Sequence, residues 1–162
     1  MGLLKSVGVK FLNDTNGLLY PHQFEKILVI TNAGGAGTVM SDLISNKLFE
    51  LDPAQIEKLN KVLPPNWSKN NPIDIIGEAT HERYLAAIKA ADDFGANAIY
   101  VIITPQFMTD VDEIANIFIN NKFKTQVFPI FLGGEMVENA KALLRKNKVA
   151  FFEELNDAAS FL

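Results

Sequence analysis

At 162 residues the chain is long enough for one domain, because domains usually contain roughly 100–200 residues. Hydrophobic residues make up 48% of it and charged residues 21%, which is a composition that supports a sizeable core. The net charge of −4 disfavours nucleic acid as a partner, since that surface needs clustered Lys and Arg. The absence of cysteine excludes disulfides, thiolate metal sites and cysteine nucleophiles, and suits a cytoplasmic location. No apolar run approaches the ~18–20 residues of a membrane span, so no membrane partner is expected.

The first regular element is a continuous apolar run at residues 26–31, which predicts a strand covered on both faces. A glycine-rich segment, residues 32–37, ends that strand. Apolar side chains then recur at helical spacing, and we expect a helix from near Thr38 to Lys47. Residues 48–51 could form a short second strand.

Further strands and helices alternate along the rest of the chain. Asp52 and Pro53 are a helix start, and Thr80 is expected to cap another helix. A further helix begins at Thr109 or Asp110, and one more begins near Glu135. Strands are expected at residues 71–76, 96–104 and 126–132, with a short segment at 150–152 and a last helical turn at 158–162.

This alternation predicts an α/β fold, a doubly wound, mostly parallel sheet with helices on both faces in a flavodoxin-like three-layer arrangement. Residues 1–25 do not belong to the alternation. We interpret them as a leader that packs on the sheet edge or as the tail of a preceding module, and residues 26–162 as the domain.

Four loops follow the predicted strands, at residues 32–38, 76–80, 104–109 and 132–135, and ligands of open α/β sheets bind at this edge. The first loop places glycines directly before a helix, where main-chain N–H groups and the helix dipole favour phosphate. The alternative interpretation is that this segment is a tight strand-to-helix turn that binds no ligand. The segment is no P-loop, and Met40 occupies the third glycine position of the dinucleotide fingerprint. The candidate phosphate-binding residues are Asn32, Gly34, Gly35, Ala36, Gly37 and Thr38.

Neither histidine is a good candidate for catalysis. His81 falls in the first turn of a predicted helix, where the positive dipole end opposes an imidazolium, and His22 lies in the leader. No residues have metal-ligand spacing, and no serine stands in a nucleophile elbow. Arg83 is a helix residue that we expect to pair with an acid on its own surface. We therefore predict no catalytic residue and no metal site in this chain.

The loops taken together resemble the NDP-forming acyl-CoA synthetases, over about residues 26–160. The resemblance is carried by Thr31-Asn32-Ala33-Gly34-Gly35-Ala36-Gly37 with Asp42, Leu63-Pro64-Pro65, Asn71-Pro72-Ile73-Asp74, Ala79-Thr80-His81-Glu82-Arg83-Tyr84, Thr104-Pro105-Gln106 with Met108-Thr109-Asp110, and Gly133-Gly134-Glu135. It corresponds to the ligase-CoA module of ADP-forming acetyl-CoA synthetases and is similar to the carboxy-terminal domain of the succinyl-CoA synthetase β subunit.

The resemblance implies a share in the reaction acyl-CoA + ADP + phosphate ⇌ acid + CoA + ATP. In that family a phosphohistidine passes its phosphoryl group between modules, and the group is held between two helix N-termini. The helix after residues 32–37 would be one of the pair. By the same resemblance, the acyl or acyl-phosphate pocket would be shaped by Asn71, Asp74, Thr104, Pro105 and Gln106.

The sequence also departs from the family. The phosphorylated histidine lies in a Ser-His-Thr-Gly-Ala type segment of a preceding module, and that segment, the CoA-binding module and the ATP-grasp module are absent from this chain. The module alone is therefore expected to be inactive and to bind no cofactor, while CoA, ATP or ADP and Mg belong to the complete enzyme. Its expected partners are the CoA-binding, phosphohistidine-bearing module and the ATP-grasp module, on the same chain or another subunit.

Two other functions remain open at this stage. One is a non-catalytic synthetase-like sensor or scaffold region of a protein lysine acetyltransferase, which these residues do not distinguish from a synthetase module. The other is a free-standing flavodoxin-like binding module for flavin or a nucleotide. Flavin usually needs aromatic residues from the strand-end loops, and Phe107 is the sole aromatic residue in the four loops.

Overall fold

Four parallel strands form the sheet at the centre of the computed structural model, which describes residues 24–162. Their spatial order is β2-β1-β3-β4, and Thr31 of β1 is in register with Asp74 on one side and Ile102 on the other. The strands are β1 (Ile27–Thr31), β2 (Ile73–Asp74), β3 (Ala98–Ile103) and β4 (Gln126–Phe131). The predicted α/β class and parallel sheet are confirmed.

Two single bridges extend this sheet. Leu48 pairs with Ile27 beside β1, and Phe152 pairs with Ile130 beside β4, both in the parallel sense. The short strands expected at residues 48–51 and 150–152 are thus reduced to one bridge each. With Phe152 in the fifth position the order is that of a flavodoxin-like sheet. The expected leader, residues 1–25, lies outside the described residues except for its last two.

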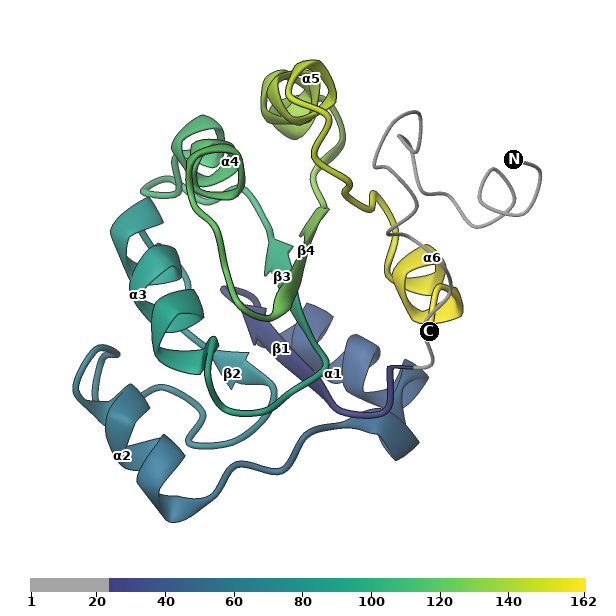
Figure 1. Ribbon diagram of the computed structural model, residues 1–162. Coiled ribbons are helices and arrows are strands. Elements are labelled where there is room, and N and C mark those ends of the chain that lie inside the picture. Colours follow the sequence, from purple (N-terminus) through teal and green to yellow (C-terminus); the bar gives the residue numbers. More distant parts are fainter. Residues whose placement is uncertain (1–23) are drawn as a thin grey trace.

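Helices cover both faces of the sheet (Figure 1). Helices α2 to α5 lie along one face, and α1 and α6 pack together on the other. The α-helices are α1 (Gly34–Leu43), α2 (Pro53–Asn60), α3 (His81–Ala91), α4 (Val111–Asn120), α5 (Glu138–Lys146) and α6 (Leu155–Ser160), with 3₁₀ turns η2 (Ser45–Lys47) and η3 (Gly134–Val137).

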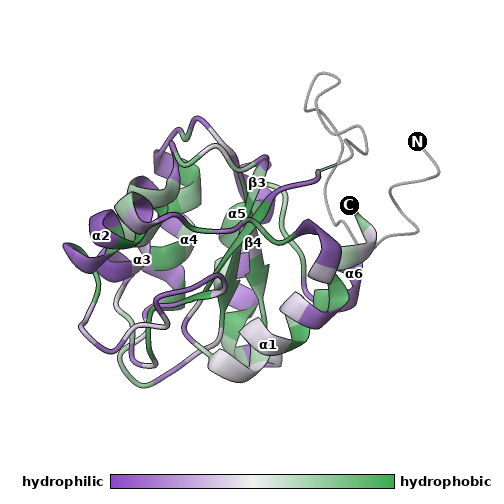
Figure 2. Ribbon diagram, turned by 90° about the horizontal axis from the view of Figure 1, so that it is seen from below, coloured by the Kyte–Doolittle hydropathy of each residue, from purple (hydrophilic) through white to green (hydrophobic). Residues whose placement is uncertain are grey.

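The core is divided into two apolar layers by the alternation of side chains along each strand. On β1, Leu28 and Ile30 face the α2–α5 layer, whereas Ile27 and Val29 face α1 and α6. Figure 2 shows the hydrophobic strands β3 and β4 between these two helical layers. The second layer contains an aromatic cluster in which Phe24 lies 5.8 Å from Phe128 and 6.4 Å from Phe161, measured between ring centroids.

Side-chain capping explains the starts of α2 and α4. Asp52 and Gln55 form a capping box at α2, with Pro53 at its first position, as the sequence predicted. The Asp110 side chain accepts the N–H groups of Asp112 and Glu113, both at 3.1 Å, and so begins α4. Thr80 occupies the expected N-cap position of α3, but its side chain makes no capping hydrogen bond.

Helix α1 begins four residues earlier than the sequence predicted. It starts at Gly34 rather than near Thr38, and its N-cap is Ala33 in an extended conformation. The positive-φ glycines among the described residues are Gly95, Gly133 and Gly134, so the glycines of α1 do not form a left-handed turn. Helical φ values at these glycines allow them to be the first turn of the helix itself.

Candidate functional site

The carboxyl ends of β1 and β3 are joined by the side chain of Asn32. Its Nδ2 donates to the Thr104 carbonyl at 2.8 Å, and its Oδ1 accepts the Thr104 N–H at 3.0 Å and the Thr104 Oγ1 at 2.9 Å. The residue is 3% exposed. Asn32, predicted as a phosphate ligand, therefore uses its side chain to fix the two loops on which a ligand would lie.

Below these loops lies the buried side chain of Tyr84 from α3. Its hydroxyl donates to the Ile102 carbonyl at 3.1 Å. Burial raises the pKa of this phenol well above its usual range, although the main-chain N–H of Asn32 acts in the opposite direction. Tyr84 therefore stays protonated and links α3 to the ends of β1 and β3.

The loops after β2 and β3 are also joined. The Thr109 hydroxyl, 7% exposed, donates to the Ala79 carbonyl at 3.1 Å. Three loops at the carboxyl edge thus form one connected surface, and Thr104, Pro105 and Gln106 of the predicted pocket lie on it. Gln106 is exposed, while Thr104 and Pro105 are half-buried.

The amino end of α1 opens onto this surface without a cap. The Thr31 hydroxyl accepts the Ala33 N–H at 3.0 Å, and the first helical hydrogen bond runs from the Gly37 N–H to the Ala33 carbonyl at 3.1 Å. No side chain caps the helix. Within residues 24–162, the N–H groups of Gly34, Gly35 and Ala36 therefore have no partner, and they carry the positive end of the helix dipole.

The predicted phosphate-binding residues of α1 fall into two groups, those whose N–H is free and those whose N–H lies within the helix. The N–H groups of Gly34, Gly35 and Ala36 are free at the amino end of α1. The Gly37 N–H is used inside the helix, and Thr38 lies in the next turn with its hydroxyl donating to the Gly34 carbonyl at 3.0 Å. The free donors are thus the three consecutive amides that lie between Asn32 and Gly37 in the predicted set and begin α1.

Two of the glycines allow close packing at this end of α1. A Cβ on Gly34 would stand 3.0 Å from Asp74 Oδ2, and a Cβ on Gly37 would stand 2.9 Å from the Thr31 methyl group. A Cβ on Gly35 would have no atom within 4 Å. Gly35 is therefore open on its outer side.

Asp74, the last residue of β2, lies beside the start of α1. Its Oδ1 accepts the N–H of Ile76 at 2.8 Å, while Oδ2 faces Gly34. Ile76 has φ 70° and Glu78 has φ 60°, conformations that are uncommon for residues other than glycine. The loop after β2 is held in a strained shape at the edge of the site.

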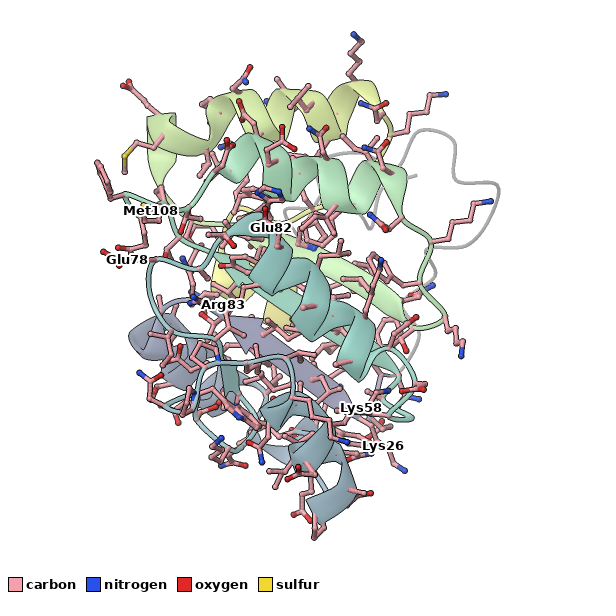
Figure 3. The ribbon with its side chains drawn as sticks, turned by 90° about the vertical axis from the view of Figure 1, so that its left-hand side faces the viewer. Lys26, Lys58, Glu78, Glu82, Arg83 and Met108 are labelled. Carbon is pink, nitrogen blue, oxygen red and sulfur yellow. The ribbon has the colours of Figure 1, made fainter. Side chains whose placement is uncertain are left out.

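Arg83 is the residue whose surroundings the sequence did not reveal. We expected it to pair with an acid on its surface, but Nη1 donates to the Ile75 carbonyl at 3.1 Å. Among the described residues no ion pair includes Arg83. Figure 3 shows Arg83 at the same end of the molecule as Glu78 and Met108, opposite Lys26 and Lys58. The guanidinium thus adds positive charge at the end where the carboxyl-edge loops lie.

Asn71 serves the sheet edge instead of the site. Its Oδ1 accepts the Val29 N–H at 2.9 Å, and its Nδ2 donates to the carbonyls of Ile27 at 2.8 Å and Phe49 at 2.9 Å. Its buried amide replaces a paired strand along the first half of β1, away from the strand's carboxyl end. The structure therefore does not bring Asn71 together with the other predicted pocket residues.

A hollow lies elsewhere along the same edge, after β4. Its volume is about 300 Å³, and it is lined by Phe131, Leu132, Gly133, Gly134, Lys141, Glu153 and Glu154. The buried Lys141 ammonium pairs with Glu138 and, at 3.6 Å, with Glu153, while Arg145 contacts Glu153 at 3.1 Å. Lys141 and Glu153 of this hollow are thus paired with each other and with the neighbouring Glu138 and Arg145.

The described part of the chain holds neither a metal-type cluster nor a membrane helix. No group of three or more His, Cys, Asp or Glu residues in it could hold a metal ion. No helix between residues 24 and 162 has both the length and the apolar character to cross a bilayer. His81 is half-exposed and contacts the Glu82 carboxylate at 3.2 Å, so the structure gives it a surface environment.

Comparison with known proteins identifies relatives of this fold and sequence. The Ligase-CoA domain family model matches residues 27–153. The chain is 32% identical over 147 residues to subunit alpha of acetate–CoA ligase [ADP-forming] II of Pyrococcus furiosus, covering 83% of this chain and 32% of that protein. It is 41% identical over 136 residues to acetate–CoA ligase [ADP-forming] of Methanocaldococcus jannaschii, covering 76% of this chain and 19% of that protein.

A solved structure gives the same relationship. A dinucleotide-forming acetyl-coenzyme A synthetase 1 of Candidatus Korarchaeum cryptofilum, in complex with phosphate and ADP, superposes with a TM-score of 0.74 at 27% identity. The match covers 86% of this chain and 32% of that one. This chain therefore spans about a third or less of the relatives it matches.

Proposed function

The chain belongs to the Ligase-CoA domain family, and from that premise we propose that it is the phosphoryl-holding module of an ADP-forming acetyl-CoA synthetase. The complete enzyme, which we place in the cytoplasm, catalyses acetyl-CoA + ADP + phosphate ⇌ acetate + CoA + ATP. A histidine on another module carries the phosphoryl group between the acyl phosphate and ADP. This module holds that group, but supplies no catalytic side chain.

The open amino end of α1 is the observation that supports this role. Three consecutive N–H groups at Gly34, Gly35 and Ala36 are unpaired within the described residues and point away from the helix. Helix ends of this kind bind phosphate because the N–H donors and the dipole both favour an anion. Asn32, Thr104 and Tyr84 hold the surrounding loops rigid, so the donors are preorganised.

The neighbouring surface suits an acyl phosphate. Thr104, Pro105 and Gln106 lie next to Asn32 on one side, and Asp74 lies next to Gly34 on the other. Arg83 is fixed by the Ile75 carbonyl and retains further N–H donors for an anion. Asn71 contributes to this pocket only indirectly, by fixing the edge of β1.

Other modules complete the enzyme. We assign CoA, ATP or ADP and Mg to the CoA-binding, histidine-bearing module and to the ATP-grasp module, on the same chain or another subunit. Exposed apolar side chains are available for contacts with them: Val39 and Leu43 on α1, and Phe107, which is 96% exposed, in the loop after β3. Surfaces of this kind commonly mark protein interfaces.

The decisive experiment is reconstitution. The chain is mixed with separately produced CoA-binding, histidine-bearing and ATP-grasp modules, and phosphorylation of the histidine by acetyl-CoA and inorganic phosphate is followed with labelled phosphate. We expect labelling only when this chain is present. Gly35→Pro removes one N–H donor while keeping a residue that the first helical turn tolerates, and it should lower the transfer rate by roughly tenfold or more.

Gly35→Ala is the matched control. It adds a Cβ in open space and keeps the N–H, so transfer should stay near the wild-type rate. Equal labelling with Gly35→Pro and with Gly35→Ala would show that the amides of α1 do not hold the phosphoryl group.

A further inference from the structure

Arg83 is a cation that the described part of the chain leaves without an acidic partner. Its guanidinium takes part in no ion pair there, although acidic residues outnumber basic ones by 19 to 15 in the sequence. Its acidic neighbours along the chain do not pair with it, since Glu82 contacts His81 at 3.2 Å and Glu78 forms no ion pair among the described residues. The positive charge of Arg83 is therefore available to an external anion.

The position of Arg83 makes this charge unfavourable in the absence of an anion. Arg83 is the third residue of α3, in the first turn, where the positive end of the helix dipole repels a cation. The residue is nevertheless half-buried and anchored, because Nη1 donates to the Ile75 carbonyl at 3.1 Å. The Ile75 N–H in turn donates to the Thr31 carbonyl at 2.8 Å. The guanidinium is thus fixed to the carboxyl ends of β1 and β2, the edge at which α/β sheets bind ligands.

Most of the hydrogen-bonding capacity of this guanidinium remains free. It carries five N–H donors in a planar fork, and its hydrogen bond to the Ile75 carbonyl uses one of them. Such a fork matches a carboxylate, which two parallel N–H groups hold bidentately. The amides of α1, which we assign to the phosphoryl group, are separate donors on another helix. Arg83 is therefore suited to the other anion of the reaction, the carboxylate of the acid.

An apolar side chain is available near this end of α3. The Thr109 hydroxyl donates to the Ala79 carbonyl at 3.1 Å, which ties the loop containing Met108 to the loop that precedes α3. Met108 is 51% exposed, and Figure 3 shows it at the same end of the molecule as Arg83. An acid whose carboxylate is held by Arg83 can place its alkyl group on the side of Met108, where apolar contact is favourable.

Resting on the synthetase function proposed above, we propose that Arg83 binds the carboxylate of the acid substrate and that Met108 borders the alkyl group of the same molecule. The substrate class is then an aliphatic monocarboxylate such as acetate. The acid and the phosphoryl group use different donors of one sheet edge, Arg83 for the first and the amides of α1 for the second.

An NMR titration of the 162-residue chain tests this assignment. The signals of the Arg83 Nε–H and of the Met108 methyl group are followed while acetate, acetamide or inorganic phosphate is added at neutral pH and equal ionic strength. We expect acetate to shift both signals to saturation and acetamide, which has the same shape without the charge, to shift neither. Phosphate should shift the amide signals of α1 instead.

Substitutions at Arg83 then measure the contribution of the guanidinium. Arg83→Gln should weaken acetate binding, read from the Met108 methyl signal, by roughly 10- to 100-fold, the range for hydrogen bonds to a charged group. Arg83→Lys keeps the charge without the fork and should weaken binding by about tenfold. Lys89→Gln is the matched control, since it removes the same charge from an exposed position in the last turn of the same helix, and it should leave acetate affinity unchanged.

The proposal is overturned if acetate leaves the Arg83 signal unmoved, if phosphate shifts that signal as strongly as acetate does, or if Arg83→Gln binds acetate as well as the wild type. An Arg83 that pairs with Glu78 in solution would have a structural role alone. Arg83→Gln and Glu78→Gln would then lower the melting temperature equally while acetate affinity stayed unchanged, which also overturns the proposal.

The reconstituted enzyme separates this inference from the function on which it rests. Labelling of the histidine by acetyl-CoA and phosphate tests the synthetase role, whereas the KM for acetate in the opposite direction tests Arg83. Labelling together with an acetate KM that Arg83→Gln does not raise would refute the role of Arg83 alone. Acetate binding at Arg83 without labelling would refute the synthetase role and leave the carboxylate site in place.

Discussion

Two glycine-containing loops precede helices at the same edge of the sheet, and glycine serves a different purpose in each. At the start of α1 the glycines have helical φ values and allow close approach of Asp74 and Thr31. After β4, Gly133 and Gly134 have φ values of 147° and 56°, and the 3₁₀ turn η3 begins at Gly134 and leads into α5. A glycine pair after a strand therefore does not identify an anion site.

The polar and charged groups around the two loops also differ, because those near α1 are unpaired and those after β4 are paired. Near α1, the three amides, the Asp74 Oδ2 and part of the Arg83 guanidinium have no protein partner in the described region. At the hollow after β4, its lining residues Lys141 and Glu153 form a connected ion cluster with Glu138 and Arg145. Unpaired polar groups, not glycine content, distinguish the proposed ligand site from a structural loop.

Among the substitutions considered, replacement of Gly133 by alanine is expected to cause the largest loss of folding stability. Alanine there would place a Cβ 2.7 Å from the Pro105 ring, in a left-handed conformation. Gly133→Ala should lower the free energy of unfolding by about 3 kcal/mol, from strain and overpacking together. Gly134→Ala has the φ penalty without the clash and should cost about 1 kcal/mol, as measured by urea denaturation. Equal losses would show that Pro105 does not restrict the loop.

A smaller loss is expected at Gly37, in the first turns of α1. A Cβ there would be 2.9 Å from the Thr31 methyl group and 3.3 Å from Pro72, while the φ value suits alanine. The gain in helix propensity partly offsets the clash, so Gly37→Ala should cost about 1 kcal/mol. Gly35→Ala has open space and should be neutral or stabilising by about 0.5 kcal/mol in the same denaturation experiment. Equal stability of the two variants would contradict the close packing of α1.

The smallest change in stability is expected from a substitution in the ion cluster after β4. A hydrogen bond from Lys141 holds the pKa of Glu138 below its usual range. A carboxyl whose folded-state pKa is depressed stabilises the fold above its unfolded pKa, near 4.5, and loses that contribution as the pH falls through the lowered value. Glu138→Gln should therefore reduce the melting temperature slightly at pH 7 and leave it unchanged near pH 2.

Glu135→Gln on η3 is the control for this cluster, since no ion pair of the described residues includes Glu135. It should have little effect at either pH. A difference between Glu138→Gln and the wild type that persists in acid would show that the charge on Glu138 is not its cause.

Strands β1 and β3 were predictable because each contains a continuous apolar run. The strand expected at residues 96–104 is β3 at Ala98–Ile103, and the one expected at 26–31 is β1 at Ile27–Thr31. Asp52 with Pro53 marked the start of α2 for a local reason, the capping box. Local chemistry and hydrophobic pattern were sufficient in these places.

The details of the site depended on contacts between distant residues. Asn32 bonds to Thr104, 72 residues away, and Asn71 bonds to Val29, 42 residues away. The residue that lies against Gly34 is Asp74, which belongs to the neighbouring strand β2. The sequence located the loop that we propose binds an anion, but the structure was needed to show which of its N–H donors have no partner among the described residues.

The aromatic contact between Phe24 and Phe161 has a consequence for how the module is carried in longer proteins. The two ends of the described part of the chain lie side by side, since these two rings are 6.4 Å apart. A domain whose two ends lie close together can be inserted between other domains without a change in its own fold. The match covers 32% of one relative and 19% of another, longer one, which fits a domain that can be inserted between other domains.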